Sequence, residues 1–286
     1  MPELPEVEVV RLQLDKHLPG KKISGVEVLD GKAVAHDKAA EKKLAGLTLG
    51  RVMRKGKLLV IATDQSDVWL LAHLKMTGQL IYVAKNQEMA GGGHTLSSTD
   101  TQLPHRHTRL IITFSDGGTL YFNDLRKFGY VKVVTQAEKD AELANYGREP
   151  IADDFTFAYF DEVLGQRKTS IKAFLLAQKH IAGLGNIYVG EVCFRAKVRP
   201  DRIVHALSET ERRALHESCR EVLEESIAVG GTTFYSFKDA NGGEGGFSQH
   251  LQVFQREGRA CYRCGETIQK IKHAGRGTHF CPGCQF

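Results

Sequence analysis

Four cysteines near the C-terminus constrain the fold of this chain more than any other sequence feature. Cys261 and Cys264 form one Cys-x2-Cys pair, Cys281 and Cys284 form a second, and sixteen residues separate the two pairs. This spacing is typical of a zinc site in which two turns each present two thiolates to one tetrahedral ion. We therefore predict one structural Zn²⁺ rather than two disulfides, which a cytosolic compartment disfavours.

The residues between the two cysteine pairs alternate in character and can form a hairpin. Its expected tip is Ala274-Gly275-Arg276-Gly277, which places an arginine at the end of a zinc-bound ribbon. Such a hairpin could enter a DNA groove, but it could equally contact another acidic partner, so the zinc ribbon alone does not define a function.

Composition narrows the function class only slightly. The chain has 286 residues with 42% hydrophobic content, which suits two globular domains better than one. Its start is acidic, and no run of eighteen apolar residues occurs, so we expect a cytoplasmic protein without a membrane span. The net charge of +5 fits a polyanionic partner without requiring one. Cys193 and Cys219 stand alone in helical sequence and are expected to be buried thiols.

The first half of the chain combines one helix with many strands. Apolar residues recur at helical spacing over residues 2–19, and Pro19-Gly20 ends that helix. Short runs rich in β-branched and aromatic residues then predict a β-sandwich or barrel over residues 22–134. Residues 85–104 are expected to form a long, mobile surface loop. The predicted strands cover residues 58–63, 68–74, 79–83, 109–114, 119–122 and 129–134.

The second half is predicted to be helical. Glycines in Ile181–Asn186 interrupt the helical pattern and predict a helix–turn–helix geometry. Gly230-Gly231 ends the last long helix, and residues 236–247 form a glycine-rich loop. The predicted helices cover residues 135–145, 155–164, 170–180, 186–196 and 208–229.

Pro2 has two interpretations. If Met1 is removed, Pro2 exposes a secondary amine, and an α-amino group titrates near a pKa of about 8. Such an amine can attack a sugar C1′, displace a base and leave a Schiff base. Glu3 and Glu6 could then manage protons at the reacting centre. From position alone, however, a proline that simply starts a helix is the stronger interpretation.

Several separated motifs together resemble the formamidopyrimidine-DNA glycosylase family. The N-terminal Pro2–Glu8 looks like the opening of these enzymes, whereas the relative called endonuclease VIII typically has glycine at the position of Leu4. The matching segments span the chain in the family's order. They are Arg54–Lys57, His73–Gly78, Asp124–Gly129, Ala182–Tyr188 and Arg276–Cys281.

The resemblance implies a bifunctional glycosylase and abasic-site lyase that excises 8-oxoguanine and formamidopyrimidines. Pro2 would be the Schiff-base nucleophile, and Glu3 the acid that assists base loss and sugar opening. Lys57 would act at β-elimination while it contacts a phosphate, although a solvated lysine in a basic run is the alternative. Arg276 would grip a phosphate and assist δ-elimination.

The resemblance also implies how damaged double-stranded DNA is held. Met76, Arg126 and Phe128 would fill the space left by a flipped nucleotide, although core packing is the alternative for Met76 and Phe128. Asn186 would bind phosphate, or cap a helix, or both. His105 and Arg167 match further DNA-contact positions, and the loop at 236–247 matches the segment that closes over the base.

The fold implied is α+β. We expect an N-terminal catalytic helix with a β-sandwich over residues 1–134 and a helix-two-turn-helix domain over 135–235. A closing loop and zinc ribbon would cover 236–286. The protein would be a bacterial monomer in the cytoplasm, associated with the nucleoid through its substrate.

Two alternatives and two departures remain. The same chemistry could act on oxidised pyrimidines, although Leu4 and the Asn186-Ile187-Tyr188 sequence favour purines. A protein that binds DNA without catalysis would require that Met1 be retained. Leu125 stands where the family usually has proline, and the loop at 85–104 is longer than usual.

Overall fold

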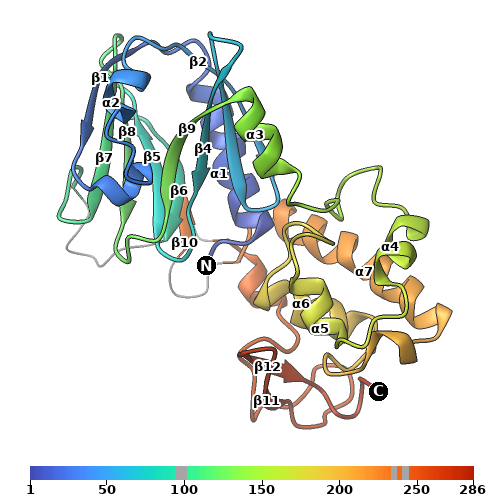
Figure 1. The fold of residues 1–286 in the computed structure, drawn as a ribbon. Coiled ribbons are helices and arrows are strands. Elements are labelled where there is room, and N and C mark those ends of the chain that lie inside the picture. The colour runs from blue at the N-terminus through green and yellow to red at the C-terminus, as the bar shows by residue number, and fades with distance from the viewer. Residues whose placement is uncertain (95–101, 233–236, 240–244) are drawn as a thin grey trace. The chain divides into compact units, whose positions relative to one another are not determined.

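The chain folds into two compact units. The computed structural model describes residues 1–94, 102–232, 237–239 and 245–286. Unit 1 comprises Met1–Ala144 and Val229–Gly246, and unit 2 comprises Asn145–Ala228 and Phe247–Phe286 (Figure 1). No helix in these described ranges is long and apolar enough to cross a bilayer.

Unit 1 is a β-sandwich with one long helix packed into it. Helix α1 spans Leu4–His17, within the predicted range of 2–19. A four-stranded antiparallel sheet has the order β2-β3-β4-β9 and contains Leu49–Lys55, Leu58–Thr63, Val68–His73 and Tyr130–Thr135. A six-stranded sheet has the order β1-β7-β8-β5-β6-β10 and contains Ile23–Val28, Thr108–Phe114, Thr119–Asp124, Gly78–Val83, Met89–His94 and Phe237–Asp239.

One apolar core joins α1 to both sheets. Val10 of α1, Leu59 of the four-stranded sheet and Leu80 of the six-stranded sheet are all buried in the same cluster. Alternating burial along β7 is the pattern expected where one face of a strand packs inward. Two short helices, η1 at Gly31–Val34 and α2 at Ala40–Leu44, contact the sandwich from the segment after β1, and α3 spans Gln136–Leu143. The predicted α+β sandwich is confirmed.

The loop predicted at residues 85–104 is wrong in part. Met89–His94 form β6, which pairs with β5 on one side and β10 on the other. Three consecutive glycines, Gly91–Gly93, concealed this strand because glycine has low strand propensity. Close approach requires them: a Cβ at Gly93 would lie 2.3 Å from the carbonyl oxygen of Gly78. Likewise, the predicted loop at 236–247 contains β10, and its residues 236 and 240–244 lie outside the described ranges.

Unit 2 is a helical domain that ends in a hairpin. Its longer helices are α4 at Phe157–Leu164, α5 at Ile171–Leu176, α6 at Asn186–Arg195 and α7 at Glu209–Ala228. Its short helices are η2 at Val204–Ala206 and η3 at Phe247–His250. Helix α7 contacts α4 and α6, and α5 also contacts α6. Helix α5 ends four residues before the predicted position 180.

The turn between α5 and α6 and the buried thiols follow the predictions. Gly183 has a φ of 103°, which favours glycine, and Gly185 caps the start of α6. Cys193 and Cys219 are fully buried, as predicted. The final hairpin consists of β11 at Gln269–His273 and β12 at Arg276–Phe280, which pair in antiparallel register.

Candidate functional site

The N-terminal turn of unit 1 holds the predicted nucleophile and acid. Pro2 is buried, Glu3 is only 3% exposed, and both immediately precede α1. The positive end of the α1 dipole therefore lies beside the chain terminus. Proximity to the same terminal charge, together with the larger effect of burial, lowers the pKa of His94 on β6. His94 was not predicted from the sequence.

Glu6 anchors this turn to a distant segment of unit 1. Its carboxylate accepts hydrogen bonds from the backbone N–H of Glu3 at 2.8 Å and of Thr232 at 2.8 Å. Glu6 is 2% exposed, and a Cβ added to Gly231 would lie 3.0 Å from its Oε1 atom. The sequence placed Glu6 near the reacting centre, but only the structure reveals that it ties residues 231–232 to the first turn of α1.

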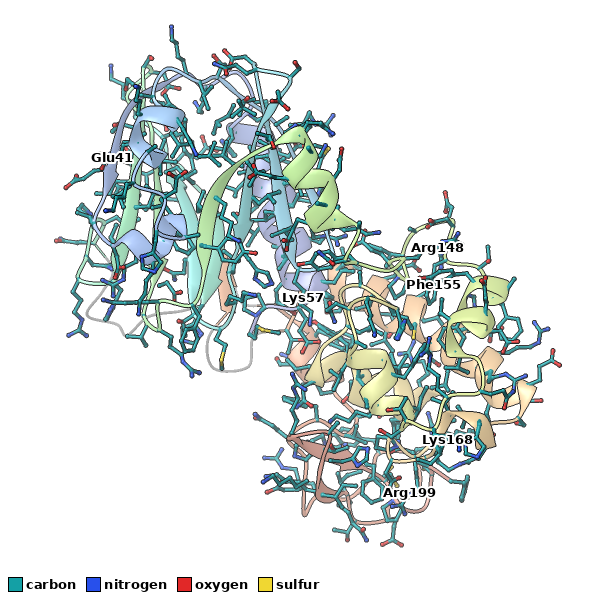
Figure 2. The ribbon with its side chains drawn as sticks, in the orientation of Figure 1. Glu41, Lys57, Arg148, Phe155, Lys168 and Arg199 are labelled. Atoms are coloured by element: carbon teal, nitrogen blue, oxygen red, sulfur yellow. The ribbon has the colours of Figure 1, made fainter. Side chains whose placement is uncertain are left out.

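Lys57 lies at the turn between β2 and β3, beside His73 at the end of β4. Figure 2 shows Lys57 at the same end of unit 1 as the N-terminus marked in Figure 1. Lys57 is 5% exposed, so the alternative of a solvated lysine is wrong. Burial, with the charges of Lys75 and Lys57 adding to it, lowers the pKa of His73 to about 3. His73 is therefore neutral, and its Nδ1 accepts a hydrogen bond from the backbone N–H of Lys75.

The three predicted wedge residues come together at one edge of the sandwich. Met76 lies in the β4–β5 turn, and Arg126 and Phe128 lie in the β8–β9 turn. The Arg126 guanidinium lies 2.9 Å from the Met76 sulfur and 4.9 Å from the centre of the Phe128 ring. Met76 is 40% exposed and Phe128 is 54% exposed. The alternative that these two side chains pack in the core is therefore wrong.

A buried carboxylate organises the two wedge turns. Asp124 is fully buried, and its Oδ2 accepts hydrogen bonds from the backbone N–H of Phe128 at 2.8 Å and of Gly129 at 2.7 Å. Its Oδ1 accepts from the Arg126 N–H at 3.1 Å and from the Thr77 hydroxyl. One side chain thus fixes both turns. The sequence drew attention to Asp124 only as the first residue of a motif.

His105 lies beside these turns, and Arg167 lies elsewhere. The backbone N–H of His105 donates to the Thr108 hydroxyl at 3.0 Å just before β7 begins. The backbone N–H of Asp124 donates to the neighbouring His107 carbonyl, which brings this segment to the wedge. Arg167 belongs to unit 2, is exposed, and donates to the carbonyl oxygen of Val163 at the end of α4.

In unit 2, a buried lysine connects the predicted phosphate ligands. The Lys172 ammonium donates to the Asn186 Oδ1 at 2.7 Å and to the Thr278 hydroxyl at 2.7 Å. The Asn186 amide in turn donates to the carbonyl oxygen of Gly277 at 3.3 Å. Asn186 is the first helical residue of α6 and Gly185 occupies the cap position, so the capping alternative for Asn186 is wrong.

This network holds Arg276 at the start of β12, next to Gly277, with its side chain exposed. Lys172 is 1% exposed and was missed from the sequence. The available signal was a single lysine within the apolar run Ile171–Leu176. A second contact, 2.7 Å between His273 and Ser170, also joins the hairpin to the start of α5.

The four predicted zinc ligands converge at the base of the hairpin. All four sulfur atoms lie within 4.8 Å of one another. The Cys264–Cys281 and Cys261–Cys284 sulfur distances are 3.4 and 3.9 Å, close to the separation of about 3.8 Å set by a tetrahedral ion with 2.3 Å bonds.

The thiols of this cluster differ in pKa. Burial raises the pKa of Cys261, but hydrogen bonds from the backbone N–H groups of Cys264 and Arg263 and from neighbouring thiols together lower it to about 7. Burial and neighbouring thiols raise the pKa of Cys281 to about 12. The donor set fits one zinc ion, in agreement with the prediction.

Comparison with protein families gives matches along most of the chain. Residues 1–131 match the formamidopyrimidine-DNA glycosylase N-terminal domain, and residues 146–238 match the H2TH domain of the same enzymes. Residues 258–285 match a zinc finger found in FPG and IleRS. A formamidopyrimidine-DNA glycosylase from Acaryochloris marina is 40% identical, with alignment over 100% of this chain and 99% of the relative.

Two solved structures of the Lactococcus lactis Fpg protein are also similar. One is a complex with DNA that contains Fapy-dG, with a TM-score of 0.86, and the other is a complex with DNA that contains an oxidised pyrimidine, with a TM-score of 0.85. Each is 36% identical and covers 99% of both chains.

Proposed function

Since this chain belongs to the formamidopyrimidine-DNA glycosylase family, we propose that it removes oxidised purines from double-stranded DNA with Pro2 as nucleophile. The protein is a DNA glycosylase and abasic-site lyase of base excision repair. The observation that carries the proposal for Pro2 is the N-terminal turn. There the start of α1 follows two buried residues, and Glu6 anchors the backbone.

The first step replaces the glycosidic bond by a bond to Pro2. The nitrogen lone pair attacks C1′, the bond from C1′ to the base breaks, and the departing base takes a proton. Glu3 is the proposed acid, because it adjoins Pro2 and is shielded from water. The bonded nitrogen then loses its own proton, and a proton delivered to the ring oxygen opens the sugar and leaves an iminium between Pro2 and C1′.

Two eliminations then cut the strand. Loss of a C2′ proton from the iminium expels the 3′ phosphate, and a second proton loss expels the 5′ phosphate. Hydrolysis of the iminium returns the free amine of Pro2. We assign Lys57 to the first elimination and to a phosphate contact, and Arg276 and Asn186 to phosphates. Lys172 is a positioning residue, because it acts through Asn186 and the β12 backbone.

The wedge occupies the space that the flipped nucleotide leaves. Exposed Met76 and Phe128 provide the apolar surface, and Arg126 provides hydrogen-bond donors to the unpaired base.

His105 and Arg167 are proposed as further DNA contacts. The zinc ion is structural: it holds the hairpin that carries Arg276. We further propose that the protein works as a monomer in the cytoplasm.

Oxidised pyrimidines are the second candidate substrate class. The similar Lactococcus lactis protein was crystallised with both an oxidised purine product, Fapy-dG, and an oxidised pyrimidine in DNA. Leu4 and Asn186-Ile187-Tyr188 support purines in this chain. We assign contact with the base to the 236–247 loop, of which residues 236 and 240–244 lie outside the described ranges.

A panel of labelled duplexes tests the proposal. Single 8-oxoguanine, Fapy-guanine and thymine-glycol lesions are incubated with the wild type and with Pro2→Gly. We expect faster cleavage of both purine duplexes, with phosphate at both ends of the gap, and slower strand cleavage in the variant, because its N-terminal amine is primary rather than the positioned secondary amine of proline. Faster cleavage of thymine glycol would overturn the purine assignment. Phosphate at only one end of the gap would contradict the second elimination.

A further inference from the structure

A groove rich in lysine lies next to the wedge, and the proposed chemistry does not use it. It encloses about 590 Å³ within unit 1. Met76 and Phe128 of the wedge form part of its wall together with Met1, which precedes Pro2, and Tyr130 lies along it. We call it the lysine groove after its four cationic residues, Lys32, Lys75, Lys127 and Lys132.

Two of these lysines are positioned by an aromatic ring and can bind an anion. The ammonium groups of Lys75 and Lys132 lie 5.7 and 4.4 Å from the centre of the Tyr130 ring. Among the described residues, neither ammonium forms an ion pair with a carboxylate. Cation–π contact restricts the side chains without neutralising their charge. The groove therefore presents two pre-positioned positive charges beside an aromatic surface.

The third lysine is oriented by an acid. Asp30 forms an ion pair with Lys127 at 2.9 Å and also accepts a hydrogen bond from the backbone N–H of Lys32. The hydrogen bond from Lys127 is the main reason that the pKa of Asp30 is lowered. Asp30 thus links the η1 segment, which carries Lys32, to the wedge turn, which carries Lys127. The wall of the groove is fixed relative to Phe128.

We propose that the lysine groove binds the sugar-phosphate backbone of the DNA strand opposite the damaged nucleotide. The inference rests on the proposed function. Pro2, Glu3 and Lys57 are assigned to the damaged strand. Arg126, which is assigned to the unpaired opposite base, lies over Phe128 at the wall of the groove. A backbone that continues past that base meets Lys75 and Lys132, and its deoxyribose packs on Tyr130.

The salt dependence of DNA binding tests the groove. Binding of a duplex with a tetrahydrofuran abasic analogue is measured between 50 and 200 mM salt, for the wild type and for the double variant Lys75→Gln/Lys132→Gln. Each phosphate contact contributes about 0.9 to the slope of log affinity against log salt. Loss of two contacts makes this slope less steep by about 1.8. The affinity lost across this salt range is then about twelvefold smaller in the variant.

A matched variant controls for net charge and folding. Lys16 and Lys85 are exposed lysines at the opposite ends of α1 and β5 from the N-terminal turn and the wedge, so Lys16→Gln/Lys85→Gln removes the same charge. We expect its slope to be close to that of the wild type. A second variant, Lys75→Arg/Lys132→Arg, should retain the wild-type slope. Equal slopes for the two glutamine variants would overturn the proposed groove.

Strand truncation tests which strand the groove takes. The undamaged strand is shortened on either flank of the analogue in separate duplexes, and the damaged strand is shortened in a matched pair. On one flank, removal of the undamaged strand should abolish the difference in the salt dependence of DNA binding between the wild type and Lys75→Gln/Lys132→Gln. If removal of the damaged strand abolishes it instead, the strand assignment is wrong.

Trapping of the wild-type protein separates this inference from the proposed function. Borohydride reduction on a duplex with a natural abasic site reports the Pro2 chemistry alone. A failure to trap, together with the expected slope change, would refute the proposed chemistry and leave the groove as a DNA site. Normal trapping with unchanged slopes would refute the groove alone.

Discussion

The β-sandwich and the zinc hairpin hold their functional residues by different means. In the sandwich, a single large core joins α1 to both sheets, with Val10, Leu59 and Leu80 all buried in it. Among the described residues, the core around the hairpin consists of Phe194, Val253, Cys261, Ile268, Cys281 and Cys284, so half of these are proposed zinc ligands. The strand β11 is mostly exposed.

The two regions are stabilised by different interactions. Burial of apolar surface stabilises the sandwich and, through it, the N-terminal turn and the wedge. The hairpin has a much smaller apolar cluster, so we expect metal–thiolate bonds to supply much of its stability. Glu191, whose buried carboxylate accepts from the backbone N–H groups of residues 252–254, fixes only the segment that leads to it.

The largest expected effect is loss of the hairpin in Cys264→Ser. A structural zinc site contributes about 10–16 kcal/mol in small zinc domains, so the variant should lose zinc and bind DNA at least about a hundredfold more weakly. Trp69, the single tryptophan, lies on β4 in unit 1, and its fluorescence should not change. Cys219→Ala is the matched control, which should keep its zinc. Normal DNA binding by Cys264→Ser would show that zinc does not position Arg276.

The converse substitution is Leu59→Ala, in the core of the sandwich. Removal of a fully buried leucine side chain costs about 2–5 kcal/mol of unfolding free energy. Urea unfolding followed by Trp69 fluorescence should show that loss, while the zinc content stays the same. Leu12→Ala, at a position that is 40% exposed, serves as the control. Loss of zinc from Leu59→Ala would mean that the two regions are not independent.

Asp124→Asn should disturb the wedge without disturbing either core. An amide retains one acceptor but cannot satisfy all the donors that Asp124 serves, and a buried unsatisfied group costs about 1–3 kcal/mol. We expect slower base excision by about 5- to 150-fold, measured in single turnover on an 8-oxoguanine duplex. Asp116→Asn, an exposed position at the other end of β7 and β8, is the control. Equal rates for the two variants would show that Asp124 does not hold the wedge turns.

The smallest effect concerns His73. Its folded pKa of about 3 lies below the usual 6.5 because of burial, so below pH 6.5 the unfolded chain binds a proton that the folded chain rejects. Its contribution is thus complete above pH 6.5 and falls by at most about 1.4 kcal/mol for each pH unit towards pH 3.

Urea unfolding at pH 7.5, 5.5 and 4.5 should therefore show a shallower pH dependence in His73→Gln than in the wild type. Carboxylates with lowered pKa values, such as Glu8, weaken the fold in acid in both proteins and so cancel in the comparison. Parallel profiles would contradict a neutral, buried His73.

Sequence patterns predicted local structure better than long-range contacts. The strand β3 has the predicted bounds, because its apolar and β-branched run carries the signal within the segment itself. The strand β6 was missed, because its partners on both sides rather than its own glycines make it a strand.

The residues of the candidate site show the same contrast between local sequence signals and long-range contacts. Spacing alone identified the four zinc ligands, whereas family resemblance supplied Pro2, Lys57 and the wedge residues. Asp124 and Lys172 were missed because their roles depend on partners that lie far away in the sequence, such as Thr77 and Thr278. A buried polar side chain acts through contacts that only the folded chain brings together.

Borohydride trapping shows directly whether Pro2 is the nucleophile. The intact mass first establishes whether Met1 has been removed, and the protein is then reduced in the presence of an 8-oxoguanine duplex. We expect a covalent adduct that peptide mapping assigns to the nitrogen of Pro2. An adduct on a lysine, or cleavage of the duplex without any adduct in protein that lacks Met1, would contradict the proposal that Pro2 is the nucleophile.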